Sequence, residues 1–437
     1  MLDVAGVRLR RFGLPQSLGT LTAQTKALTY YDGLPALPYC TLVAVSGSEA
    51  RSEGVGGTRG FLPPVEGMRA CAAVGVVVTH VAFQTGHTGG VVGRLFGRFD
   101  LAVAVFFALS GFLLWRGHAA AARGLRPVPA TGHYLRSRLV RIMPAYLVAV
   151  VVILTLLPDV KADLTVWLAN LTLTQIYVPL TLTAGLTQMW SLAVEVSFYV
   201  ALPVIALLVR RVPVKARIPA LAGAGLLSLG WALIPFATPV GVSSVNWPPA
   251  FSAWFVAGML LAELTVTPVC LAHRLARKRI LMAAVALVAF CIAASPIAGP
   301  EGLTPGTAQQ FIVKVAMGAV VAGALLAPLV LDAPDTSHRI LGNATMVTLG
   351  RWSYGLFIWH LAALWMVFPI IGEFAFNGHM PVVLVLTVLI GFAIAAVSYA
   401  LVESPCRVAL RRWEYRRSSP AAPAPPLDSA VAVERVG

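Results

Sequence analysis

Ten apolar segments dominate this sequence and constrain its fold more than any other feature. A helix needs roughly 20 apolar residues to cross the hydrocarbon core of a bilayer, and tilt allows somewhat shorter or longer spans. Of the 437 residues, 58% are hydrophobic and only 12% are charged, which exceeds what a soluble core needs. The sequence therefore predicts an all-α polytopic membrane protein with about ten transmembrane helices, at 68–84, 99–115, 142–157, 190–209, 218–236, 250–266, 280–296, 308–331, 347–371 and 381–402.

The basic residues, which give a formal net charge of +15, gather in alternate loops between these segments. The remaining loops contain only Arg94, Arg98 and Lys161. Because basic loops stay in the cytoplasm, this asymmetry predicts a multi-pass plasma-membrane protein with both termini in the cytoplasm. The basic residues are spread over many loops, without a dense patch or interleaved aromatic residues, and this argues against nucleic acid as a partner. The basic loops hold Arg116, Arg123, Arg126, Arg136, Arg138, Arg141, Arg210, Arg211, Lys215, Arg217, Arg274, Arg277, Lys278, Arg279, Arg339, Arg407, Arg411, Arg412, Arg416 and Arg417.

The two ends of the chain differ from the apolar region between them. Residues 1–61 mix Gly, Ser and Arg with short apolar pieces and lack the pattern of a secretory signal. We expect them to be disordered or to be an extension from an upstream start codon, with the working protein beginning near Pro63. Residues 62–407 form the predicted transmembrane domain. Residues 408–437, which include the run Ser-Ser-Pro-Ala-Ala-Pro-Ala-Pro-Pro, are expected to be a disordered cytoplasmic tail.

Arg69 and His80 are two ionisable residues within the first apolar segment. An ionisable group in hydrocarbon costs at least about 2–3 kcal/mol, so its presence there is a functional-site hypothesis. Eleven residues make about three helical turns, so both side chains point to the same side, roughly 16 Å apart along the axis. The sequence places Arg69 at the membrane face and His80 near mid-depth. This pair indicates a catalytic function rather than a simple membrane anchor.

Glu195 is a third charge inside a predicted span, the fourth. A buried carboxylate needs a partner, and His80 or Arg69 would suit, because a carboxylate orients an imidazole that acts as a base. A hydrogen bond between helices, without a role in chemistry, is the alternative. Lys314 and Glu263, in later spans, give weaker signals.

Three further groups of residues have both a functional and a structural interpretation. Ser110, in Phe-Phe-Ala-Leu-Ser-Gly-Phe, either serves the site or only permits close helix packing. Arg138 and Arg141 share one helix face, where they either grip phosphates in a bidentate way or meet anionic lipid headgroups. His360 either has a role in the function or is an interior histidine whose hydrogen bonds are all made within the protein.

The pattern of histidines and cysteines gives no support for a bound metal. The eight histidines form no HxxxH or HExxH set, and the five cysteines show no CxxC pairing. We therefore expect no metal site.

The order of these motifs resembles the membrane-bound acyltransferase 3 family, from about Leu62 to Arg407. The family pattern of a basic residue, ten residues and a histidine is met in the first helix, and its Phe-Phe-x-x-Ser-Gly-Phe signature follows. Phe357 stands where a Tyr is frequent, and Ser404 separates the final Glu and Pro. The matching positions are Arg69, His80, Asp100, Phe106 to Phe112, Arg138, Arg141, Pro144, Trp190, Ser191, Glu195, Tyr199, Ser353, Tyr354, His360, Glu403 and Pro405.

The resemblance implies transfer of an acyl group, usually acetyl, from acyl-CoA to a hydroxyl of a carbohydrate-containing acceptor. Cell-envelope glycan, a lipid-linked sugar and a secreted glycoside or macrolide remain open as acceptors. Acyl-CoA is then a co-substrate, and no tightly bound cofactor is expected. His80 is expected to be the general base or to carry the acyl group itself. The implied supporting residues are Glu195 and Arg69 in catalysis, Arg138, Arg141 and Ser110 in donor binding, and Asp100, Trp190, Ser191, Tyr199, Tyr354 and His360 as further candidates.

A polytopic transporter or exporter of a polar metabolite is the competing interpretation, because intramembrane charges also occur in transporters. Transporters often contain paired repeats with interrupted helices at matching positions. No such repeat is visible in this sequence. A purely structural membrane protein would leave the cost of the three embedded charges unexplained.

Overall fold

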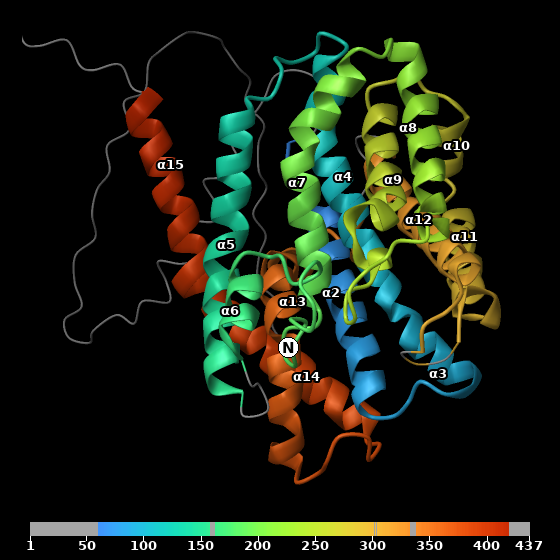
Figure 1. Ribbon diagram of the computed structural model, residues 1–437. Coiled ribbons are helices and arrows are strands. Elements are labelled where there is room, and N and C mark those ends of the chain that lie inside the picture. Colours follow the sequence, from blue (N-terminus) through green and yellow to red (C-terminus); the bar gives the residue numbers. More distant parts are fainter. Residues whose placement is uncertain (1–59, 158–161, 301, 303, 333–337, 419–437) are drawn as a thin grey trace, which may run out of the picture. The chain divides into compact units, whose positions relative to one another are not determined.

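A computed structural model describes residues 60–157, 162–300, 302, 304–332 and 338–418, and these residues form helices and connecting loops without any strand. The predicted all-α membrane fold is confirmed. The expectations for residues 1–59 and 419–437 lie outside the described residues. Figure 1 shows the helices, which are α2 (Pro63–Gln84), α3 (Gly90–Gly97), α4 (Ala102–Ala121), α5 (Thr131–Leu156), α6 (Leu164–Leu171), α7 (Met189–Arg210), α8 (Val214–Leu229), α9 (Ser252–Leu264), α10 (Leu271–Ala276), α11 (Arg279–Ala294), α12 (Ala308–Val330), α13 (Ala344–Ile371), α14 (Met380–Ser398) and α15 (Ser404–Ser418).

All ten predicted spans coincide with helices in the described part of the chain. Eight helical segments are long and apolar enough to cross a membrane. The sixth and seventh predicted spans are the shorter apolar helices Pro248–Leu264 and Arg279–Ala294. Sixteen residues rise about 24 Å, less than the roughly 30 Å hydrocarbon thickness, so the seventh helix is short for a span.

Local signals in the sequence account for several helix ends. α2 begins with proline in its first turn, where the missing N–H costs nothing. Thr307 and Gln310 form a capping box at the start of α12, and the Asn343 side chain accepts a hydrogen bond from the Met346 N–H at the start of α13. α13 ends at Gly372, whose φ of 71° lies in the left-handed region that favours glycine.

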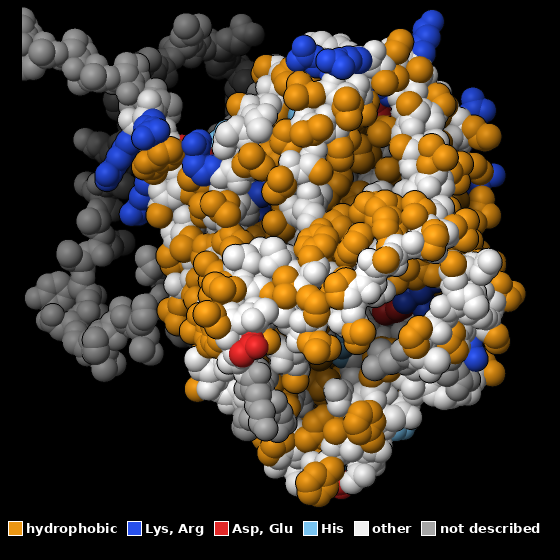
Figure 2. Space-filling view, viewed as in Figure 1, with side chains coloured by type: hydrophobic (Ala, Val, Ile, Leu, Met, Phe, Trp, Pro, Cys, Tyr) orange, Lys and Arg blue, Asp and Glu red, His pale blue; other side chains and the backbone are white. Residues whose placement is uncertain are grey.

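The surface of the described residues is largely apolar, as a bilayer requires. Figure 2 shows hydrophobic side chains over most of one face, and basic side chains gathered near the junction of α7 with α8 and along α15. On α7, Val200, Leu207 and Leu208 are exposed although each is hydrophobic. These side chains therefore face the hydrocarbon of the membrane.

Small residues let α4 and α9 pack closely. A Cβ on Gly258 of α9 would collide with the carbonyl oxygen of Ala108, and one on Gly111 of α4 would collide with that of Phe255. Such close approach is the usual way in which membrane helices gain packing energy.

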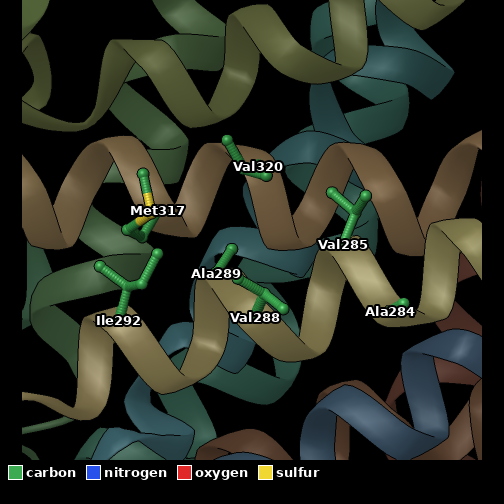
Figure 3. Close-up of a pocket in the computed structure, with 7 residues that line it drawn as sticks. All are labelled: Ala284, Val285, Val288, Ala289, Ile292, Met317 and Val320. Carbon is green, nitrogen blue, oxygen red and sulfur yellow. The ribbon is translucent and has the colours of Figure 1, made fainter.

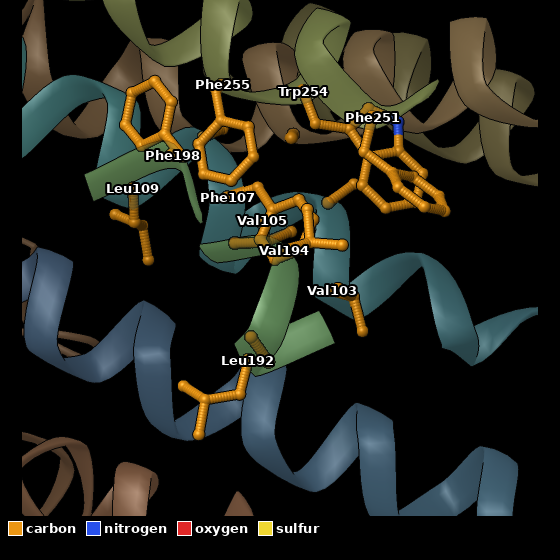
Figure 4. Close-up of a cluster of buried hydrophobic side chains, with 14 of the residues drawn as sticks. Val103, Val105, Phe107, Leu109, Leu192, Val194, Phe198, Phe251, Trp254 and Phe255 are labelled. Carbon is orange, nitrogen blue, oxygen red and sulfur yellow. The ribbon is translucent and has the colours of Figure 1, made fainter. Parts of the chain in front are cut away.

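An aromatic cluster fills the space where α4, α7 and α9 meet (Figure 4). The Phe255 ring stacks on Phe107 at 4.4 Å and on Phe198 at 4.1 Å between centroids. The indole N–H of Trp254 donates to the Val315 carbonyl of α12 at 2.7 Å, so this buried donor is satisfied. The cluster fixes α4, which carries part of the candidate site.

α15 covers residues 404–418 and so continues past residue 408, where the tail is expected to begin. The helix packs beside α5 in Figure 1. Its Glu414 pairs with His133 at 2.9 Å and with Arg136 at 3.4 Å, and the Arg136 guanidinium lies 4.7 Å from the Trp413 ring centroid. These contacts between distant segments order residues that composition alone assigned to a tail.

Substitution of Gly258 by alanine tests the close packing of α4 on α9. The new methyl group meets backbone at Ala108, so we expect Gly258→Ala to lower the free energy of unfolding by about 1–3 kcal/mol. Thermal unfolding in detergent measures this effect. Gly223→Ala in α8 is the matched control, because no atom lies within 4 Å of the added Cβ and alanine favours a helix. Equal stability of the two variants would contradict the packing.

Candidate active site

His80 and His360 come together, although they stand 280 positions apart. α2 packs against α13, which places His360 Nε2 3.3 Å from His80 Nδ1. The ring centroids lie 4.9 Å apart, with an angle of 61° between the planes. His80 is partly exposed, whereas His360 is completely buried. The two predicted site residues therefore form an imidazole pair with one accessible member.

Asp100 and Lys314 form an ion pair near this imidazole pair. The Lys314 ammonium lies 2.5 Å from an Asp100 carboxylate oxygen, and Arg98 lies 3.8 Å from the same atom. Asp100 also interacts electrostatically with His80. Lys314 is only a weak candidate from the sequence, yet it is the single charged residue within the apolar segment 308–330. A lone charge inside a span is the feature that could have indicated it.

Glu195 has partners other than the expected ones. Its carboxylate accepts a short hydrogen bond from the Ser110 hydroxyl and another from the Tyr199 hydroxyl at 2.5 Å. These partners replace the predicted pairing with His80 or Arg69. The reason is helix packing, because α7 lies against α4, whereas the His80 end of α2 packs on α13.

Four arginines gather at the Pro63 end of α2. Arg141 of α5 interacts electrostatically with Arg69, Arg138 and Arg407. Arg407 comes from α15 and was missed as a site residue, because it stands far from the others in sequence. Its ion pair four residues back with Glu403 is the signal that could have indicated it.

Positive charge is in excess at this arginine cluster, which we define as Arg69, Arg138, Arg141 and Arg407. Arg69 lies 3.7 Å from Glu66, and Arg407 lies 3.0 Å from the buried Glu403. The Nε atoms of Arg69, Arg138 and Arg407 are buried without a hydrogen-bond partner. Donors of this kind in a low-dielectric setting favour an anionic ligand.

Three other candidates make structural contacts. The Trp190 ring packs on Phe251 with centroids 4.9 Å apart. Ser191 donates to the Gln188 carbonyl at 3.2 Å, within one helix turn. The Tyr354 hydroxyl donates to the Ile142 carbonyl at 2.9 Å and so joins α13 to α5.

A groove between α11 and α12 is lined by apolar side chains, none of which is a catalytic or metal-binding group (Figure 3). Four of its lining residues, Ala284, Val288, Ile292 and Val320, are exposed, so the groove opens to the surface. Within the described residues, no group of three His, Cys, Asp or Glu side chains lies close enough to hold a metal ion. The groove is lined by Ala284, Val285, Val288, Ala289, Ile292, Met317 and Val320.

Comparison with known proteins agrees with this arrangement of residues. The family model described as an acyltransferase domain, of the acyltransferase 3 family, matches residues 64–401. The chain belongs to this family. It is therefore a membrane acyltransferase with multiple transmembrane helices.

Relatives support the same conclusion. Acyltransferase MdmB of Streptomyces mycarofaciens is 27% identical over 412 residues, which are 86% of this chain and 98% of the relative. O-acetyltransferase OatA of Staphylococcus aureus is 24% identical over 79% of this chain, and peptidoglycan O-acetyltransferase OatA of Listeria monocytogenes is 22% identical over 80%. The matches cover only 57% and 56% of these two OatA proteins. No solved structure matches the chain significantly.

A double-mutant cycle tests whether Ser110 and Tyr199 act together on Glu195. Each of Ser110→Ala and Tyr199→Phe removes one donor from the partly buried Glu195 carboxylate, at a cost of about 1–3 kcal/mol. We expect the two effects to be non-additive by about 0.5–3 kcal/mol, measured from unfolding in detergent. Ser197→Ala is the control, because that hydroxyl bonds only to the Ala193 carbonyl of its own helix. Strict additivity of Ser110→Ala and Tyr199→Phe would contradict a shared carboxylate.

Proposed function

We propose that this enzyme is an O-acyltransferase that moves an acyl group, acetyl in the simplest case, from acyl-CoA to a hydroxyl of a carbohydrate-containing acceptor. One observation carries the proposal: α2 bears a member of a cationic anion-binding cluster at one end and a partly exposed imidazole at the other. The OatA relatives are named O-acetyltransferases, which supports acetyl as the group and oxygen as its acceptor atom.

The arginine cluster is the proposed site for the phosphates of acyl-CoA. Guanidinium groups bind phosphate through paired, charge-assisted hydrogen bonds. The buried Nε atoms without partners in Arg69, Arg138 and Arg407 provide such donors. From there an extended pantetheine arm reaches along α2 toward His80, a distance of roughly 16 Å at 1.5 Å per residue.

His80 is the proposed general base. As the acceptor hydroxyl attacks the thioester carbon, its proton passes to the imidazole, a C–O bond forms, and the C–S bond then breaks. The proton on His80 returns to the departing CoA thiolate, which leaves the imidazole neutral for the next cycle. Lys314 and Asp100 lie near His80 and provide polar groups for acceptor hydroxyls or for the oxyanion that forms.

The proposed orientation places both termini and the arginine cluster on the cytoplasmic side of the plasma membrane, where acyl-CoA is made. The basic loops support it, because the ends of α4, α7 and α15 and the starts of α5, α8 and α11 carry most of the Lys and Arg residues. His80 then lies toward the outer leaflet. Acceptors reached from there are cell-envelope glycan, a lipid-linked sugar, and a secreted glycoside or macrolide.

Acyl transfer from radiolabelled acetyl-CoA tests the function. Purified protein in lipid nanodiscs is supplied with a mixture of envelope glycans, lipid-linked sugars and glycosides. We expect wild type to label one acceptor class, and His80→Ala to lower transfer by about 10²-fold or more, because general base catalysis is lost. His87→Ala is the matched control, an exposed histidine just beyond α2. Unchanged transfer by His80→Ala would overturn its role, and wild type that neither binds nor consumes acetyl-CoA would overturn the function.

Loss of one guanidinium tests the donor site. Arg141→Ala removes the arginine that interacts with the other three, so we expect the dissociation constant for acetyl-CoA to rise about tenfold or more. Calorimetric titration with acetyl-CoA and with CoA measures it. Arg210→Ala, at the exposed end of α7, is the control for a general loss of positive charge. An equal effect of both variants would contradict a specific phosphate site.

A further inference from the structure

Two backbone carbonyls determine which nitrogen of each imidazole carries a proton. His80 Nδ1 lies 2.8 Å from the Val76 carbonyl oxygen, and His360 Nδ1 lies 2.7 Å from the Phe357 carbonyl oxygen. A carbonyl oxygen only accepts hydrogen bonds, so both Nδ1 atoms carry hydrogen. In the neutral rings both Nε2 atoms are then unprotonated, and each has a free lone pair.

The contact between the rings now has a defined direction. His80 Nδ1–H donates mainly to Val76 and also faces His360 Nε2 at 3.3 Å. His360 Nε2 has its lone pair available, so it accepts from His80. His80 Nε2 is left as the basic atom of the pair.

We propose that His360 is the positioning residue of the proposed acyltransferase: together with the Val76 carbonyl it holds His80 in the tautomer whose Nε2 takes the acceptor proton, and it accepts a hydrogen bond from the imidazolium that forms. The inference rests on the proposed function, and it assigns to His360 the part that a carboxylate has in other catalytic dyads. The acceptor proton adds to Nε2 of His80, and the Nδ1 proton stays where it is. No proton passes to His360.

The surroundings explain why an imidazole has this position. His360 is completely buried, and a carboxylate at its site would need desolvation within the membrane. A neutral imidazole accepts the hydrogen bond without adding a buried charge. Glu195, the residue expected to orient His80, is instead bonded to Ser110 and Tyr199. The remaining charged group near His80 is Asp100, which is paired with Lys314.

Two amide substitutions separate the acceptor role of His360 from its packing. An Asn side chain reaches the position of Nδ1 and retains the bond to the Phe357 carbonyl, but it places no acceptor at the position of Nε2. A Gln side chain reaches the position of Nε2 and restores an oxygen there. We expect His360→Asn to lower kcat by about 10²-fold, and His360→Gln to remain within about tenfold of wild type. Binding of acetyl-CoA should be unchanged in both.

A similar loss of kcat in both variants, or loss of acetyl-CoA binding with kcat, would overturn the inference in favour of packing alone. Full activity of His360→Asn would also overturn it.

Nitrogen NMR of histidine-labelled protein tests the tautomer without any activity, so it separates this inference from the proposed function. In wild type, the His80 signals, identified by their loss in His80→Gln, should show a protonated Nδ1 and an unprotonated Nε2. In His360→Asn only the Val76 carbonyl still accepts from Nδ1–H, so we expect part of the His80 population to shift to the Nε2–H tautomer, and in His360→Gln we expect the wild-type pattern. An Nε2–H tautomer in wild type would overturn the inference even if acyl transfer is confirmed.

Discussion

The need to pair every ionisable group that lies within the membrane governs this structure. A charge or imidazole in hydrocarbon is costly, so each one must find a partner through the packing of helices. Glu263 shows the principle at its simplest: it is completely buried and accepts from Trp115 at 2.8 Å and Arg123 at 2.6 Å, with Arg217 at 3.5 Å. These contacts join α4, α8 and α9. Glycine contacts allow the helices to approach closely enough for such pairs to form.

The arginine cluster differs from Glu263, because its positive charges are only partly balanced by carboxylates. Arg69 pairs with Glu66 and Arg407 pairs with Glu403, and three buried Nε atoms of the cluster have no partner. The π-helical turn Tyr399–Glu403 places Glu403 and starts α15 so that Arg407 reaches the cluster. Such turns are frequent at functional sites. This excess of positive charge supports the proposed binding of an anionic donor at the cluster.

The transmembrane helices were predictable from the sequence, because each one is a continuous run of mainly apolar residues. The same is true of Arg69 and His80, which lie on one helix. The partner of His80 was not predictable: Glu195 and His360 were both candidates, and only the packing of α2 on α13 decides between them. Arg407 and Lys314 were underestimated for the same reason, since their partners are far away in sequence. α15 lies beyond the last apolar run, and tertiary contacts with α5 order it.

We propose that the donor enters at the arginine end of α2 and that the acyl group is transferred at the His80 end. Membrane vesicles of either orientation, with their own envelope acceptors, test it directly with radiolabelled acetyl-CoA, which does not cross membranes. A cleavable tag after Gly437 reports which face is outside. We expect labelled product when the face with α15 is outside, and none from the opposite orientation until the vesicles are permeabilised. Equal labelling of both intact orientations, or labelling of the opposite one alone, would contradict it.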